Sequence, residues 1–151
     1  GLQEAHDGHL TLSVAGVMLR IPQSGSAGTA TSNLIWDGSV LLARALEERP
    51  RWVRGRRALE LGAGCGLAGL SAAAMGATEV CLTELTEALP TLKRNVLMHV
   101  GRLEPCHISV AALDLKKLPP WWATAQAQER ILVADLVWEH ELAASLVEAL
   151  A

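Results

Sequence analysis

Phenylalanine and tyrosine are absent from this chain of 151 residues, so five tryptophans supply all of its aromatic side chains. No apolar run reaches the roughly 18 residues of a membrane-spanning helix. The N-terminus also lacks the basic segment, apolar run and cleavage site that mark a signal peptide. We therefore expect no membrane partner. Half of the residues are nevertheless apolar, which excludes a disordered chain and permits a hydrophobic core.

Cysteine is scarce, and the two signs of charge are nearly balanced. The three cysteines are scattered and form no Cys-x-x-Cys pair, so the sequence predicts neither a disulfide framework nor a metal site. A reducing compartment is expected, the cytoplasm first and the nucleus as the alternative.

The net charge is −3, and the densest basic run, residues 49–57, is too narrow for a nucleic-acid-binding face. We interpret this run as a solvated connector and expect no nucleic-acid partner.

The spacing of apolar residues predicts a short hairpin followed by alternating strands and helices. After a polar, frayed tail at residues 1–9, partial alternation over residues 10–21 around Ala15-Gly16 predicts two antiparallel strands. Residues 23–31 are rich in small and polar residues and predict a loop. Asp37 is expected to cap a helix over residues 38–48. Further strands are expected at 57–61, 79–84, 107–113 and 130–134, and further helices at 67–75, from just before Pro90 to 100, and at 139–151. This order predicts an α/β fold with a parallel sheet.

A glycine-rich turn joins the first of these later strands to its helix, with the sequence Glu60-Leu61-Gly62-Ala63-Gly64-Cys65-Gly66-Leu67. A turn this tight requires positive φ angles or the absence of a Cβ, which glycine supplies. The helix that follows presents free N–H groups and the positive end of its dipole. Two cofactor classes use this geometry. Dinucleotides place a pyrophosphate there, whereas S-adenosylmethionine (SAM) places its amino-acid end and ribose near the loop.

Two acidic residues help to separate the cofactor classes. Glu60 precedes the first glycine, where its negative charge suits the ammonium group of SAM and would repel a pyrophosphate. This argues against a dinucleotide-dependent oxidoreductase. Glu84 ends the next strand, about 20 residues after the turn, where an acid can bind both ribose hydroxyls of either cofactor. A turn with a purely structural role is the alternative, but the strand, the helix and both acids together favour SAM.

Four segments, in this order, resemble the seven-strand protein-lysine methyltransferases called methyltransferase family 16. They are Ile35-Trp36-Asp37-Gly38, the turn within residues 58–70, Leu82-Thr83-Glu84 with Leu92-Lys93-Arg94-Asn95-Val96 after it, and Ala134-Asp135-Leu136-Val137-Trp138. The resemblance spans about residue 10 to the C-terminus. It implies a Rossmann-like, SAM-dependent methyltransferase fold, a parallel sheet with helices on both faces. Residues 1–31 would form the tail, hairpin and loop, and residues 32–151 the SAM-binding domain.

The resemblance also implies a site. The SAM pocket would be lined by Trp36, Glu60, Gly62, Ala63, Gly64, Gly66, Glu84, Leu85, Asp114, Leu115 and Ala134. Asp135 and Trp138 would face the substrate lysine, with Asp135 orienting its ammonium and Trp138 holding it by a cation–π contact. The implied reaction moves the SAM methyl group to a neutral lysine amine of a protein and leaves S-adenosylhomocysteine. Structural roles are the alternatives, namely a cap on the last helix for Asp135 and core packing for Trp36 and Trp138.

The chain departs from the family pattern at several points. Glu84 stands in place of the usual Asp, Asp114-Leu115 where a Trp often lies against the adenine, and Trp138 in place of Tyr or Phe. The family sheet has three further strands, whereas this chain ends on the helix after the fourth strand. We therefore expect an incomplete sheet, either because the chain is a C-terminally truncated piece of a longer protein or because a partner or a second copy covers the exposed edge. A methyltransferase for another substrate, and an inactive SAM-fold module that binds a partner, are the alternative functions.

Overall fold

Two sheets form the framework of the computed structural model, which describes residues 2–5, 8–23, 31–124, 128–137 and 140–150. The first sheet is antiparallel, in the order β1-β2-β3, with bounds Leu2–Ala5, His9–Val14 and Val17–Pro22. The second is parallel, in the order β6-β5-β4-β7, with bounds His107–Ala112, Glu79–Glu84, Arg57–Leu61 and Arg130–Val133. The predicted α/β class with a parallel sheet is therefore confirmed.

The N-terminal sheet contains the predicted hairpin and one strand that was not predicted. Val14 pairs with Val17 across Ala15 and Gly16, whose φ angles of 49° and 80° are typical of a type I′ turn. The tail was expected to be frayed, but it forms β1, which pairs antiparallel with β2. The alternation along β2 and β3 buries side chains that join the main hydrophobic core, namely Leu10, Leu12, Val14, Leu19 and Ile21.

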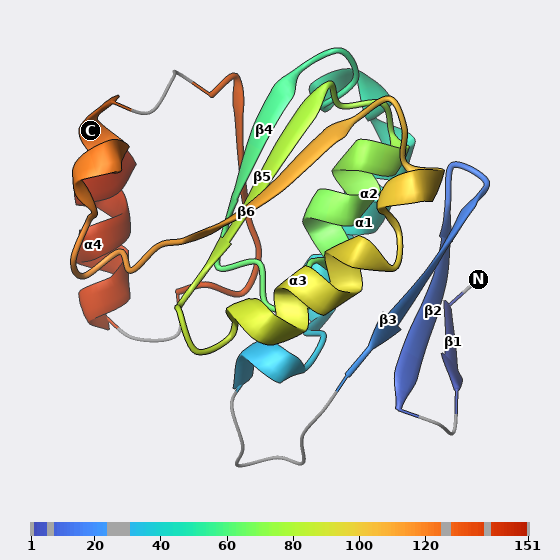
Figure 1. Ribbon diagram of the computed structural model, residues 1–151, viewed down its shortest axis with the longest axis horizontal. Helices are drawn as coiled ribbons and strands as arrows, with labels where there is room; N and C mark the ends of the chain where they lie inside the picture. Colours follow the sequence, from blue (N-terminus) through green and yellow to red (C-terminus); the bar gives the residue numbers. More distant parts are fainter. Residues whose placement is uncertain (1, 6–7, 24–30, 125–127, 138–139, 151) are drawn as a thin grey trace.

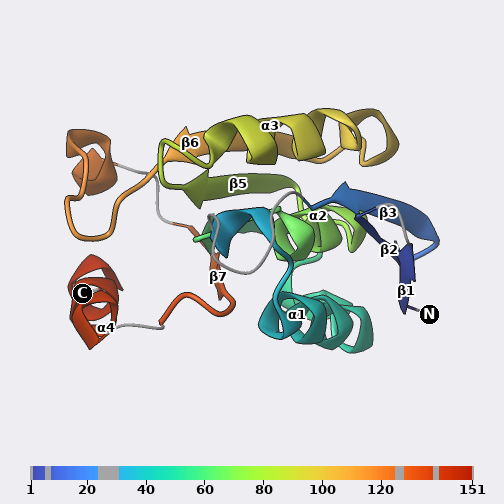
Figure 2. The same ribbon diagram turned by 90° about the horizontal axis from the view of Figure 1, so that it is seen from below.

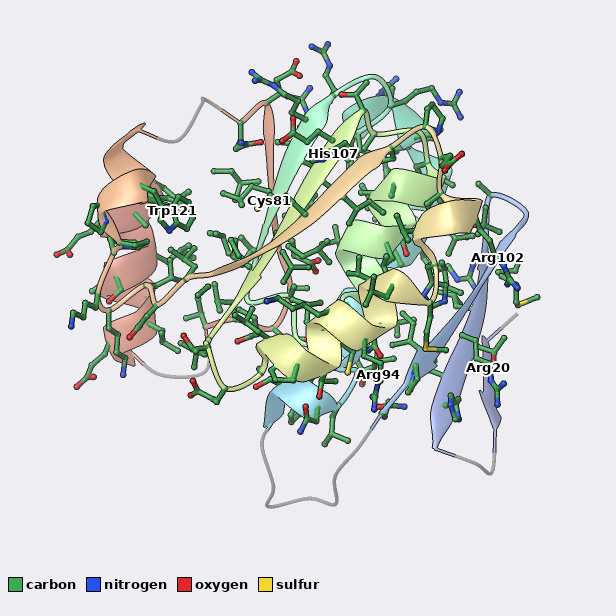
Figure 3. All side chains as sticks on the ribbon, in the orientation of Figure 1. Arg20, Cys81, Arg94, Arg102, His107 and Trp121 are labelled. Carbon is green, nitrogen blue, oxygen red and sulfur yellow. The ribbon has the colours of Figure 1, made fainter. Side chains whose placement is uncertain are left out.

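Helices cover both faces of the parallel sheet (Figure 1). On one face lie α1, α2 and α3, with bounds Asp37–Glu48, Leu67–Ala74 and Leu89–Leu97. On the other face lie α4, His140–Leu150, and a short 3₁₀ helix, Pro120–Thr124, an arrangement that is also clear from below (Figure 2). The antiparallel sheet packs against α1 and α2. Figure 3 shows Trp121 of the 3₁₀ helix on the α4 side, where its ring meets that of Trp122 edge to face at 5.9 Å.

Small residues let α2 lie close to the parallel sheet. All of its residues except Ala74 are buried. A Cβ on Gly69 would stand 2.5 Å from Oε2 of Glu60 and 2.7 Å from Cδ2 of Leu82, so only glycine permits this approach. The close packing of α2 on β4 and β5 fixes the turn that joins β4 to α2.

The two outer strands of the parallel sheet each have one neighbour among the described residues. β7 pairs with β4, β6 pairs with β5, and the β7 residue Ile131 is 42% exposed. A smaller core on the α4 face joins Leu59 and Leu61 to residues that follow β6 and to Trp122, Leu136 and Leu146. Within the described ranges, no helix combines the length and the apolarity needed to cross a membrane.

Candidate functional site

A cavity of about 900 Å³ opens beside the carboxyl ends of the parallel strands. Its walls come from residues within 32–39, 62–67, 84–87, 112–119 and 134–137, together with Leu142. Parallel α/β sheets bind ligands at this edge where the strand order reverses, and here the order reverses at β4, which lies between β5 and β7. The volume falls in the range of small-molecule sites, about 300–1,000 Å³.

The glycine-rich turn forms one wall of the cavity. Gly62, Ala63 and Gly64 line it, and the two glycines have φ angles of 64° and 53°, which other residues rarely adopt. A Cβ on Gly62 would also overlap Cδ1 of Leu136. Gly66, with φ of 87°, is the N-cap of α2 and lies outside the cavity lining. It therefore contributes to the conformation of the turn without lining the cavity.

Glu84 is fixed at the cavity by two backbone groups. Its Oε2 accepts a hydrogen bond from the Gly64 N–H at 2.8 Å, and its Oε1 accepts one from the Leu85 N–H at 2.8 Å. The residue is 8% exposed. An ionised carboxylate has about four acceptor positions, so Glu84 can accept further hydrogen bonds from a ligand while both backbone contacts persist.

Glu60 lies outside the cavity lining, although the sequence placed it in the SAM pocket. It is buried beneath α2, and its Oε2 accepts the Gly69 N–H at 2.9 Å. Burial raises the pKa of Glu60 to about 8; the Gly69 hydrogen bond opposes this shift and the charge of Glu84 enlarges it. The side chain is therefore mostly neutral near pH 7. It joins β4 to α2 instead of presenting a negative charge to the cavity.

The wall that follows β6 contains two more of the predicted residues. Asp114 and Leu115 both line the cavity. Oδ1 of Asp114 accepts the Lys116 N–H at 2.9 Å, which turns the chain back on itself. Leu115 is buried in the smaller core. This wall therefore combines an apolar surface with one carboxylate and the two lysines Lys116 and Lys117.

The last wall brings together two segments almost 100 residues apart. Trp36 lines the cavity and is 49% exposed, so it is not an ordinary core residue. Ala134 and Asp135 line it from the loop after β7. Oδ2 of Asp135 accepts the Gly38 N–H at 2.6 Å, so this carboxylate caps α1. Trp138 lies outside the described residues.

Several lining residues were not predicted from the sequence, among them Ser32, Leu34, Ile35, Thr86, Glu87 and Lys117. Those at 86, 87 and 117 follow predicted residues closely, so proximity to a motif could have identified them. Residues 32–34 belong to no motif, and Ile35 begins the Ile35-Trp36-Asp37-Gly38 segment without having been predicted at the site. These residues are held by contacts distant in sequence: the Ile35 N–H donates to Oε1 of Gln23 at 2.8 Å, and the Ser32 carbonyl oxygen lies over Gly64.

Known proteins resemble this chain over most of its length. A protein-family profile described as lysine methyltransferase matches residues 14–151. EEF1A lysine methyltransferase 3 of Xenopus tropicalis is 31% identical over 137 residues, which cover 89% of this chain and 58% of that protein. Protein N-lysine methyltransferase METTL21A of Mus musculus is 34% identical over 156 residues, which cover 99% of this chain and 67% of that protein. The chain thus spans about two thirds or less of the lengths of these two relatives.

A solved structure shares the fold. The putative RNA methyltransferase PH1948 from Pyrococcus horikoshii matches with a TM-score of 0.58 and 16% identity, covering 84% of this chain and 62% of that one. At this identity the match supports the Rossmann-like methyltransferase fold alone. The family profile, in contrast, covers all but the first 13 residues. The chain therefore belongs to the lysine methyltransferase family.

Proposed function

We propose that this chain is the SAM-binding part of an enzyme that transfers the methyl group of SAM to a lysine side chain of a protein. The observation that carries the proposal is the cavity, where the glycine-rich turn and the ordered carboxylate of Glu84 meet at the reversal of strand order. The two relatives are both named protein-lysine methyltransferases, which supports the same substrate class.

The residues of the cavity fit the chemistry of SAM. Glu84 is held by backbone N–H groups and keeps acceptor positions for the two ribose hydroxyls. Gly62 and Gly64 line the cavity without side chains of their own, and the amino-acid end of the cofactor would lie along this part of the turn. Leu85, Asp114 and Leu115 would border the adenine. When bound, SAM supplies a methyl group on a positively charged sulfur.

The substrate lysine must lose a proton before its amine can attack. Near neutral pH a lysine side chain is mostly protonated, and an apolar environment lowers its pKa because burial disfavours the charged form. The walls of the cavity offer such an environment through Leu34, Ile35, Trp36 and Val137. Alignment of the amine with the methyl group would supply much of the remaining rate. A cation–π contact from Trp138 is part of the same proposal.

Incubation with methyl-labelled SAM and protein substrates tests this function. We expect label on protein, with methyllysine identified by peptide mass spectrometry, and no label with a Glu84→Ala control. Label on small molecules alone would assign a different substrate class. Binding of S-adenosylhomocysteine without any methyl transfer would indicate that the chain is an inactive SAM-fold module and not part of an enzyme.

The second candidate is a SAM-fold module that binds a partner chain, and the outer edge of β7 is the observation behind it. Among the described residues β7 pairs with β4 alone, and Ile131 is half-exposed. Free strand edges tend to pair with other chains. We infer that this edge is covered by further strands of the same protein, by a second copy or by a partner chain.

A cytoplasmic or nuclear location belongs to the same proposal, because Cys65, Cys81 and Cys106 are free thiols, as is usual in a reducing compartment.

A further inference from the structure

Helix α1 begins without a capping side chain of its own. Trp36 holds the N-cap position in an extended conformation, and an indole ring cannot accept a hydrogen bond as the side chain of Ser, Thr, Asp or Asn would. The acceptor comes from the loop after β7, 97 residues away, where Oδ2 of Asp135 accepts the Gly38 N–H at 2.6 Å. Gly38 is the second residue of α1, whose N–H is a usual partner of a cap oxygen. Asp135 therefore replaces the missing N-cap side chain.

The same contact explains two unusual residues. A Cβ on Gly38 would overlap the carboxylate of Asp135, which accounts for a glycine in the first turn of a helix, where alanine is the better helix former. Asp135 itself has φ of 51°, in the left-handed region that few residues other than glycine adopt and that Asp tolerates better than most. The contact thus accounts for the glycine in α1, and Asp135 makes it from a left-handed backbone conformation.

The next residue extends this contact to the glycine-rich turn. Cδ1 of Leu136 occupies the space that a Cβ on Gly62 would need, so the Leu136 side chain packs directly on the turn. Residues 135 and 136 therefore connect two walls of the cavity, the start of α1 and the turn. The segment of residues 32–36 leads into α1 and also contacts the turn, since Sγ of Cys65 lies 3.7 Å from the Ser32 carbonyl oxygen.

We propose, building on the methyl-transfer function above, that Asp135 is a positioning residue. Its carboxylate caps α1 and so holds Trp36 and residues 32–35 in place as a wall of the cavity, and it does not bind the substrate ammonium. The positive end of the α1 dipole already compensates its charge. The hydrogen bond to Gly38, and not the negative charge, is what methyl transfer requires of this residue.

Three substitutions separate a hydrogen-bond acceptor from a charge. Asp135→Asn keeps an acceptor oxygen and loses the charge, whereas Asp135→Ala loses both. Asp37→Asn removes a charge from the same helix end and leaves the Asp135–Gly38 bond intact. We expect Asp135→Asn and Asp37→Asn to keep kcat/KM within about twofold. Asp135→Ala should weaken S-adenosylhomocysteine binding and lower kcat/KM about fivefold, which corresponds to a helix cap of about 1 kcal/mol at about 1.4 kcal/mol per factor of ten.

Gly38→Ala provides a matched test, because its effect should depend on residue 135. In the wild-type protein the added Cβ displaces the carboxylate, so Gly38→Ala should lower kcat/KM as much as Asp135→Ala does. In the Asp135→Ala background the Cβ meets no carboxylate and favours the helix, so it should leave kcat/KM unchanged or raise it. Such coupling is expected only of residues that act through one contact. Equal losses in both backgrounds would overturn the proposal. So would an Asp135→Asn variant as impaired as Asp135→Ala, with only the KM of the protein substrate raised.

Hydrogen exchange at the Gly38 amide tests the cap without catalysis. Exchange should be slow in the wild type and in Asp135→Asn, and faster in Asp135→Ala, because the first turn of α1 then opens more often. If the wild type binds no S-adenosylhomocysteine, the methyl-transfer function fails, but the Gly38 exchange rates still report whether Asp135 caps α1. Equal exchange in all three proteins would overturn the capping role.

Discussion

Replacing Glu60 with glutamine should remove a pH dependence of stability that the wild-type protein shows. Burial raises the pKa of Glu60 from 4.5 to about 8, so the folded protein holds a proton that the unfolded chain releases between these values. A raised folded-state pKa gives stability that is complete below pH 4.5 and is lost as the pH rises through 8. Since each pKa unit corresponds to about 1.4 kcal/mol, the loss has a ceiling of about 5 kcal/mol.

Urea unfolding of both proteins between about pH 5 and pH 9 measures this loss. Glutamine keeps an oxygen for the Gly69 N–H and does not titrate. The free energies of unfolding of wild type and Glu60→Gln should therefore be similar near pH 5, with the variant becoming the more stable protein above about pH 6. All other titrating groups are shared, so the difference between the two curves reports the ionisation of Glu60 together with its interaction with Glu84. If the free energies of unfolding of the two proteins changed in parallel with pH, Glu60 would not be protonated in the folded protein.

The same variant tests the position of Glu60 relative to the cavity. Glu60 lies outside the cavity lining, so Glu60→Gln should bind S-adenosylhomocysteine with an affinity close to that of the wild type. A folded variant that no longer binds would show that Glu60 contacts the ligand, as expected from the sequence alone.

Gly62→Ala should lower the free energy of unfolding by about 1–3 kcal/mol, because a φ of 64° and the Leu136 side chain both oppose a Cβ. In the same urea experiment Gly101→Ala, whose added Cβ has nothing within 4 Å, should be neutral or slightly stabilising; equal losses would refute the crowding at Gly62. His99→Phe should lower the free energy of unfolding by about 1–3 kcal/mol, since Nε2 of the buried His99 accepts the Arg20 N–H at 3.0 Å and Nδ1 lies 2.7 Å from the backbone carbonyl oxygen of Asn95. A loss no larger than that of a change at the exposed His107 would contradict this. Glu84→Ala should abolish the thermal stabilisation by S-adenosylhomocysteine, about 2.7 kcal/mol at 100 times the Kd, whereas Glu84→Asp should keep part of it; an unchanged shift in Glu84→Ala would show that Glu84 does not bind the ribose.

The spacing of apolar residues made the parallel sheet predictable. The four strands β4 to β7 lie within one residue of the bounds expected from their short apolar runs. The turn between β4 and α2 was equally clear, because its glycines are required by φ angles that are local to the chain. Local sequence patterns therefore predicted the elements whose conformation is determined by residues close together in the chain.

Contacts between distant segments were not predictable in the same way. The tail carries little apolar alternation, and β1 forms because β2 offers a free edge for pairing. The direction of the Glu60 side chain depends on the space that Gly69 leaves beneath α2. The cap of α1 joins Asp135 to Gly38 across 97 residues. The sequence marked both segments as candidates for the site, but it contained no signal of the bond between them.

Calorimetric titration of S-adenosylhomocysteine into the wild-type protein and into Glu84→Ala tests whether the cavity binds SAM through Glu84, with NAD as the comparison ligand. We expect saturable binding of S-adenosylhomocysteine to the wild type, no detectable binding to Glu84→Ala, and no binding of NAD to either protein. A wild-type protein that binds no S-adenosylhomocysteine, or that binds NAD in its place, would contradict SAM binding in the cavity.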